Sequence, residues 1–103
     1  MPAYIVFQRD STTDPKELEI YGPMARASGA GHPIKGLAAA SRLGSFVHGR
    51  HEVLEGADVE AVVIVEFPTF EDAKKWYDCP AYREAREHRF KGAKYRAVLV
   101  QGV

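Results

Sequence analysis

The chain has 103 residues, enough for one domain with a modest core, and its 46% hydrophobic and 27% charged residues are typical of a globular fold rather than a disordered or fibrous one. Its 14 basic side chains balance 14 acidic ones, so no positive field gathers nucleic acid or an anionic membrane. The single cysteine, Cys79, excludes an internal disulfide and a zinc site built on two or more thiolates.

The apolar segments are too short to span a bilayer. The longest runs cover residues 4–7 and 61–65, and the N-terminus lacks the basic and apolar segments of a targeting signal. We therefore expect residues 1–103 to form a single domain of a soluble, cytoplasmic protein.

The first elements are a strand and a helix. Residues 3–9 are apolar on both faces, which predicts a strand covered on both sides. Asp14 and Pro15 then supply an N-cap carboxylate and a first-turn proline, which together open a helix. Pro23 lacks an N–H, so we expect it to kink or interrupt that helix after one or two turns. The apolar face of the helix consists of Leu18, Tyr21 and Ala25.

The middle of the chain is rich in turn formers. Glycines and a proline punctuate residues 29–33, and the apolar spacing of residues 34–41 predicts a short second helical piece before Gly44. Residues 45–48 are the expected second strand, continued by Val53-Leu54 beyond a bend at Gly49-Arg50.

The second half of the chain carries stronger signals. Residues 60–67 form a strand that is apolar on both faces. Thr69 caps the helix that follows, and Pro80 begins another helix extending to about residue 90. Residues 95–101 are the fourth strand. The order β-α-β-β-α-β predicts an α+β fold, the ferredoxin-like sandwich, with both helical regions on one face of an antiparallel sheet.

One face of such a sheet has no helix to cover it. Because the first, third and fourth predicted strands are apolar on both faces, we expect a homodimer in which two sheets pack face to face, a dimeric α+β barrel.

Taken together, several segments resemble a known bacterial family. The residues that carry the similarity are Ala3-Tyr4, Tyr21, residues 46–49, 52–56 and 65–68, Trp76-Tyr77, Pro80 and Tyr82. The chain looks like a member of the domain of unknown function 1330 family, which implies a dimeric α+β barrel and no established reaction. The family usually has Arg-Gly-Gly where this chain has His48-Gly49-Arg50. It also passes more directly from the first helix to the second strand, so residues 31–43 look like an insertion.

Polar side chains at residues 48–66 form one candidate site. His48 titrates near neutrality and could transfer a proton, with Glu55 or Glu66 orienting it, while Arg50 could hold an anionic substrate. His48 and His51 are three residues apart, so in an extended strand their rings point to opposite faces, and we predict no metal site. The alternative is that these residues serve as strand, turn and surface positions without chemistry.

Aromatic side chains form a second candidate site. Tyr21, Trp76 and Tyr77 could wall a substrate pocket between the helices and the sheet. Trp76 shares the apolar stripe of Phe70 and Ala73, which favours a core position, whereas the hydroxyl of Tyr21 could remain reachable beside the expected helix break. There is no glycine-rich phosphate loop, and we expect no cofactor. Basic side chains near the C-terminus alternate with acidic ones and predict a solvated, salt-bridged face: Arg83, Arg86, Arg89, Lys91, Lys94 and Arg96.

These residues leave three functional hypotheses open. The first is a cofactor-free enzyme that transfers a proton on a small aromatic or oxo-acid metabolite, in an isomerase- or lyase-like reaction. The second is a non-catalytic dimer that binds a small molecule or a protein. The third, which rests on fold analogy alone, is a cofactor-independent oxygenase.

Overall fold

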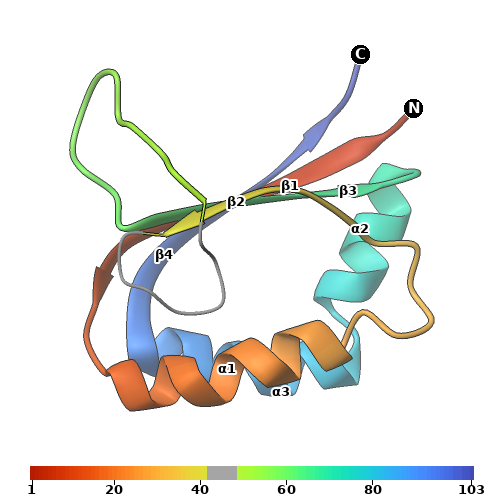
Figure 1. Ribbon diagram of the computed structural model, residues 1–103. Helices are drawn as coiled ribbons and strands as arrows, with labels where there is room; N and C mark the ends of the chain where they lie inside the picture. Colours follow the sequence, from red (N-terminus) through yellow and green to blue (C-terminus); the bar gives the residue numbers. More distant parts are fainter. Residues whose placement is uncertain (42–48) are drawn as a thin grey trace.

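The computed structural model describes residues 1–41 and 49–103 and contains a four-stranded sheet with helices packed on one of its faces (Figure 1). In chain order the elements are β1 (Ala3–Thr12), α1 (Pro15–Ala27), β2 (Lys35–Ser41), β3 (Ala61–Phe67), α2 (Phe70–Tyr77), α3 (Pro80–Gly92) and β4 (Ala93–Gln101).

The sheet has the strand order β2-β3-β1-β4, and every neighbouring pair is antiparallel. This is the ferredoxin-like arrangement, so the predicted fold class is confirmed. α1 and α3 lie side by side below the sheet in Figure 1, and both termini lie at one end of it. In the residues that the structure describes, the opposite face of the sheet carries no helix, and we call it the open face.

An aromatic core fixes the sheet to α2 and α3. The rings of Trp76 and Tyr82 stack with their centroids 4.1 Å apart, and Phe67 lies 5.6 Å from Trp76. Phe67 and Tyr82 have no solvent-exposed surface. Such ring pairs add to the free energy gained from burial alone, by about 0.5–1.5 kcal/mol each. This side of the molecule is therefore densely packed.

Helices α1, α2 and α3 begin where the sequence predicts, after Asp14, Thr69 and Cys79. The Asp14 carboxylate accepts a hydrogen bond from the Lys16 amide at the start of α1, and Thr69 Oγ1 accepts one from the Asp72 amide at the start of α2. Cys79 occupies the N-cap position of α3, but its side chain makes no capping hydrogen bond and instead packs against the core. Among the described residues, no helix is long and apolar enough to cross a membrane.

The prediction that Pro23 interrupts the first helix is wrong. α1 runs through Pro23 to Ala27. Proline removes the hydrogen bond to the carbonyl four residues earlier, at Glu19, and both residues are exposed, so water can satisfy that carbonyl.

The prediction of a helical piece at residues 34–41 is also wrong, because β2 pairs with β3 along Lys35–Ser41, with an irregularity at Leu37. Most of the expected insertion at residues 31–43 therefore carries a strand of the sheet, and residues 42 and 43 lie outside the described residues. The second strand predicted at residues 45–48 falls outside the described residues, and its expected continuation is not a strand. Leu54 lies in the 49–60 loop and is 86% exposed.

The alternation of the strands defines the two faces of the sheet. The pairs Ile5↔Val65 and Phe7↔Val63 face the helices, and the intervening pair Val6↔Ile64 faces the open side. Val98 and Val100 of β4 also lie on the open face, where they are 48% and 47% exposed. The 49–60 loop, drawn in green in Figure 1, stands on this same side of the sheet.

Candidate functional site

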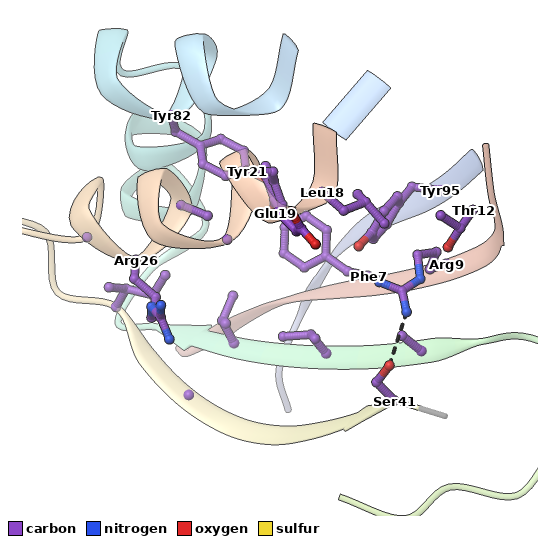
Figure 2. A pocket seen from close by; sticks show the side chains of 18 of the residues that line it. Phe7, Arg9, Thr12, Leu18, Glu19, Tyr21, Arg26, Ser41, Tyr82 and Tyr95 are labelled. Atoms are coloured by element: carbon purple, nitrogen blue, oxygen red, sulfur yellow. Dashed lines mark hydrogen bonds between the residues drawn. The ribbon is translucent and has the colours of Figure 1, made fainter. Parts of the chain in front are cut away.

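A cavity of about 1020 Å³ lies between α1 and the helix-covered face of the sheet (Figure 2). It exists because α1 packs mainly against α3 rather than against the strands, and none of the residues of α1 is fully buried. The predicted apolar face of α1 therefore lines the cavity: Leu18, Tyr21 and Ala25. Val63 and Val65 of β3 form the opposite wall. A cavity of this size and apolar character is typical of a site for a small organic molecule.

A chain of hydrogen-bonded hydroxyl groups ends at this cavity. The hydroxyl oxygens of Tyr21, on α1, and Tyr82, on α3, are 2.8 Å apart, and both residues line the cavity. Arg89 Nη1 donates to the Tyr82 hydroxyl over 3.2 Å, and Nη2 donates to the Tyr77 hydroxyl over 3.3 Å. We call Arg89, Tyr82 and Tyr21 the tyrosine relay. It connects a buried cation to the cavity wall.

The tyrosines of the relay hold their protons firmly. Burial raises the pKa of Tyr21, although the hydrogen bond with Tyr82 and the charge of Arg89 act in the opposite direction. Burial, together with the neighbouring Tyr21, raises the pKa of Tyr82 far above its ordinary range. Both hydroxyls are therefore neutral donors at physiological pH.

Arg89 stays charged. Burial by itself would lower the pKa of Arg89, but the surrounding tyrosine oxygens more than offset this effect and leave it raised. Arg89 is only 3% exposed, and its Nε has no hydrogen-bond partner in the described part of the chain. Rings of Phe7, Phe90 and Tyr95 surround it with centroids 5.1–5.4 Å away. Contacts with ring faces offset part of the cost of burying the charge.

Arg9 and Arg26 themselves line the cavity, and Arg9 lies at one end of it (Figure 2). Arg9 Nε forms a 3.1 Å ion pair with Glu60, and Arg9 Nη2 donates to Ser41 over 3.0 Å. Glu60 also accepts hydrogen bonds from the Thr12 hydroxyl and amide. Arg9 is 7% exposed. Both charges of this pair are compensated.

Trp76 belongs to the aromatic core and also lines the cavity. Its Nε1 donates to the Ser28 hydroxyl at the C-terminus of α1 over 3.1 Å. Ser28 in turn donates to the Ala25 carbonyl. The bond between Trp76 and Ser28 links the C-terminal end of α1 to α2.

The residues of the predicted sites divide into three groups. Tyr21 and Trp76 line the cavity, while Tyr77 lies one step behind it, in contact with Arg89. Arg50 and Glu55 are exposed in the 49–60 loop, and Glu66 lies on the open face opposite Lys35 and Tyr4. Within one protomer the structure does not bring Glu66 together with Tyr21. His48 lies outside the described residues.

The neighbouring histidine of the loop has a structural partner. His51 Nε2 lies 2.8 Å from the Val59 carbonyl oxygen, within the same loop. In residues 1–41 and 49–103, no group of three or more His, Cys, Asp or Glu side chains could hold a metal ion.

Tyr82 and Arg89 are not among the predicted site residues, and the prediction that the basic residues near the C-terminus are solvated is wrong for Arg89. Tyr82, Ala85 and Arg89 form one buried stripe on α3 at helical spacing. The aromatic and alanine at positions 82 and 85 are the signal that could have placed position 89 inside. The alternating basic and acidic residues on the other faces of α3 made Arg89 look like one more surface residue in the sequence.

Together, the ferredoxin-like fold and the cavity define a small α+β protein with a mainly apolar cavity between its helices and its sheet. The model of the family described as domain of unknown function (DUF1330) matches residues 2–103, so the chain belongs to that family and the resemblance seen in the sequence is confirmed. No curated protein matches the sequence.

Solved structures with the same fold are distant in sequence. A protein of unknown function from Rhodopseudomonas palustris is 18% identical with a TM-score of 0.68, over 99% of this chain and 82% of that one. A dimeric ferredoxin-like protein of unknown function from Thermobifida fusca is 16% identical with a TM-score of 0.67, over 99% and 92% of the two chains. SnoaB, a cofactor-independent oxygenase from Streptomyces nogalater, is 11% identical with a TM-score of 0.62, over 99% and 93%.

Proposed function

We propose that the chain is a cofactor-free enzyme that binds a small aromatic or oxo-acid molecule in the cavity and transfers a proton on it, in an isomerase- or lyase-like reaction. The observation that carries the proposal is the Tyr21 hydroxyl at the wall of a large, mainly apolar cavity. Apolar walls bind the body of such a molecule, and a single hydroxyl donor orients its carbonyl oxygen.

The chemistry would be enolisation. A base removes a proton from the carbon next to the carbonyl, the C–H electron pair forms a C=C bond, and the carbonyl π pair moves to the oxygen, which accepts a hydrogen bond from Tyr21. Return of the proton at another carbon completes an isomerisation. Glu19 lines the cavity and is our candidate base, and His48 remains the candidate from the sequence. Glu55, Glu66 and Arg50 would take part only through the loop or a second protomer.

The test follows deuterium incorporation into phenylpyruvate, an aromatic oxo acid, in D₂O by NMR. We expect the protein to accelerate exchange at the carbon next to the keto group, and Tyr21→Phe to reduce that acceleration by about 10²-fold, the ordinary contribution of one positioned acid or base. Tyr4→Phe, which removes a hydroxyl on the open face, is the matched control and should exchange like the wild type. Equal exchange with and without protein would contradict the proposal.

A non-catalytic binding protein is the second candidate, and one observation favours it. Glu60, the carboxylate held at one end of the cavity, is already bonded to Arg9 and Thr12 and so is poorly suited to accept a proton. Binding of phenylpyruvate, measured by calorimetry, without any accelerated exchange would select this function. SnoaB is a reason to keep cofactor-independent oxygenation as a third candidate, and oxygen consumption with phenolic substrates tests it.

We also propose that the chain is a homodimer joined through the open face. Val98 and Val100 are about half exposed there, Leu54 is almost fully exposed on the same side, and the related Thermobifida fusca protein is described as dimeric. Apolar surface of this kind is typical of an interface.

Sedimentation velocity tests the dimer. We expect the wild type to sediment as a dimer at micromolar concentration and the double variant Val98→Lys, Val100→Lys to sediment as a monomer, because each lysine would place an unpaired charge in the interface. Glu84→Lys, an exposed change on α3, should remain dimeric. A monomeric wild type would overturn the proposal.

A further inference from the structure

The charge of Arg89 has no counter-ion in the described part of the chain. No carboxylate there forms an ion pair with it, its two bonded partners are the hydroxyls of Tyr82 and Tyr77, and its Nε has none. A cation buried to this degree is costly unless an anion or a set of hydrogen bonds compensates it. The aromatic rings around it compensate only in part.

The relay also has a proton that no protein group in the described residues accepts. Arginine has only donors, so the Tyr82 oxygen accepts from Arg89. Either hydroxyl could be the donor in the 2.8 Å bond between Tyr82 and Tyr21, and we assign that role to Tyr82 because it has no accessible surface and its proton needs a partner inside the protein. That arrangement leaves the Tyr21 proton as a donor directed at the cavity. Successive hydrogen bonds polarise one another, so the positive charge of Arg89 strengthens this donor.

We infer that the ligand binds at Tyr21 through a single ionised oxygen of a conjugated system, a phenolate or an enolate, and that Arg89 is the positioning residue that supplies the balancing positive charge through Tyr82. This inference rests on the proposed function, because it assumes that the cavity is the binding site. One hydroxyl donor matches one oxygen atom, whereas a carboxylate is usually held by two donors. Of the arginines that line the cavity, Arg9 is already neutralised by a carboxylate, and Arg26 already has an interaction partner of its own, so we assign the balancing charge to Arg89.

The geometry agrees with this assignment. Tyr21 and Tyr82 reach the cavity from α1 and α3, and Phe7 lies between them and the sheet (Figure 2). A planar ring bound along these aromatic walls would point its oxygen at the Tyr21 hydroxyl. The tyrosines themselves stay neutral, because burial raises the pKa of both. The negative charge therefore comes from the ligand.

The experiment uses 4-nitrophenol as the probe, because its ionised and neutral forms have different absorption spectra. Its pKa is measured free and in the presence of saturating protein, and 4-nitroanisole, the neutral methyl ether, reports binding without ionisation. We expect the wild type to bind the ionised form at least 10-fold more tightly than the neutral form, which lowers the pKa of the bound phenol by at least about one unit.

Two variants locate the effect in the relay. Tyr21→Phe removes the donor and leaves Arg89 and Tyr82 in place, and Arg89→Met removes the charge. Both should reduce the preference for the ionised form to less than 2-fold while 4-nitroanisole still binds, and Arg89→Lys should restore part of it. Arg86→Met is the matched control: its guanidinium stacks on Tyr77 and pairs with Asp78, outside the relay, so the preference should be unchanged.

The outcomes separate this inference from the proposed function. If 4-nitroanisole binds but 4-nitrophenol binds in its neutral form, or if both relay variants keep the preference, the inference is wrong and the cavity remains a binding site. If neither probe binds, both the inference and the proposed binding site are wrong. Should Arg89→Met fail to fold, Tyr21→Phe alone decides the outcome.

Discussion

Two arginines are buried in the described part of the chain, and they sit in different electrostatic surroundings. Arg9 is paired with the Glu60 carboxylate and bonded to Ser41, and Thr12 completes the hydrogen bonding of Glu60. Arg89 is buried more deeply, and its partners among the residues that the structure describes are hydroxyl groups and aromatic rings. The bonds of Arg9 join β1 to β2 and to the end of the loop that leads into β3. Arg89 carries a positive charge close to the cavity that no carboxylate in the described residues balances.

This difference indicates that the protein gives up stability at Arg89 rather than at Arg9. A completed ion pair stabilises only if its geometry is good, whereas a lone buried charge is tolerated when binding requires it. Stability and ligand binding should therefore respond to the two arginines in opposite ways.

The largest effect on stability is expected at the Arg9 end. Glu60→Gln removes the negative charge and leaves the Arg9 guanidinium buried without a counter-ion, so the free energy of unfolding should fall by about 3 kcal/mol. Urea unfolding followed by circular dichroism measures it. Glu84→Gln, an exposed carboxylate on α3, should change stability by less than about 0.5 kcal/mol. A similarly small change at Glu60 would mean that Arg9 is compensated by other groups.

An intermediate effect is expected at alkaline pH from the relay tyrosines. The pKa of Tyr82 is raised above its ordinary value of 10.0 in the folded protein, so above pH 10 the unfolded chain loses a proton that the folded chain keeps. Stability should then fall as the pH rises, by about 1.4 kcal/mol per pH unit for each such hydroxyl.

Comparing urea midpoints at pH 8 and pH 11 for the wild type and Tyr82→Phe tests this pH dependence. The variant should lose less stability between the two pH values than the wild type does. An equal loss in both proteins would show that Tyr82 does not hold its proton more tightly in the folded state.

The smallest effect on stability is expected from Arg89→Met, in contrast with its effect on the bound phenol. Replacing a buried charge that has no carboxylate partner among the described residues by an apolar side chain of similar length is often nearly neutral, so we expect a change of less than about 1 kcal/mol in the free energy of unfolding. The same urea titration measures it. A loss of 3 kcal/mol or more would mean that the tyrosine bonds and ring contacts fully compensate the guanidinium, and the contrast with Arg9 would disappear.

Much of the fold is predictable from the sequence because its signals are local. Caps at Asp14 and Thr69 define helix starts, and strands that are apolar on both faces define β1, β3 and β4. β2 escaped prediction because its Leu37 to Ala40 stretch has helical spacing and three alanines, which favour helix. Pairing with β3 overrides that local preference, and such pairing is not visible in a single sequence.

The site is predictable only in part. Tyr21 and Trp76 were expected to line a pocket, and they do lie at the cavity. The relay depends on which of several basic residues on α3 points inward, and that choice is set by the packing of Tyr82 beneath Trp76. The polar cluster that dominates the sequence around residue 50 lies instead in a loop on the other side of the sheet.

Hydrogen bonds hold α1 at both of its ends, and this affects how the cavity beside it can change during evolution. At its N-terminal end, the amides of Thr13 and Asp14 donate to the Gly92 carbonyl, and at its C-terminal end Ser28 is bound to Trp76. Between these anchors, Leu18, Gly22 and Ala25 line the cavity. Exchanging Leu18 or Ala25, or adding a side chain at Gly22, would change the volume of the cavity while leaving both anchors of α1 in place.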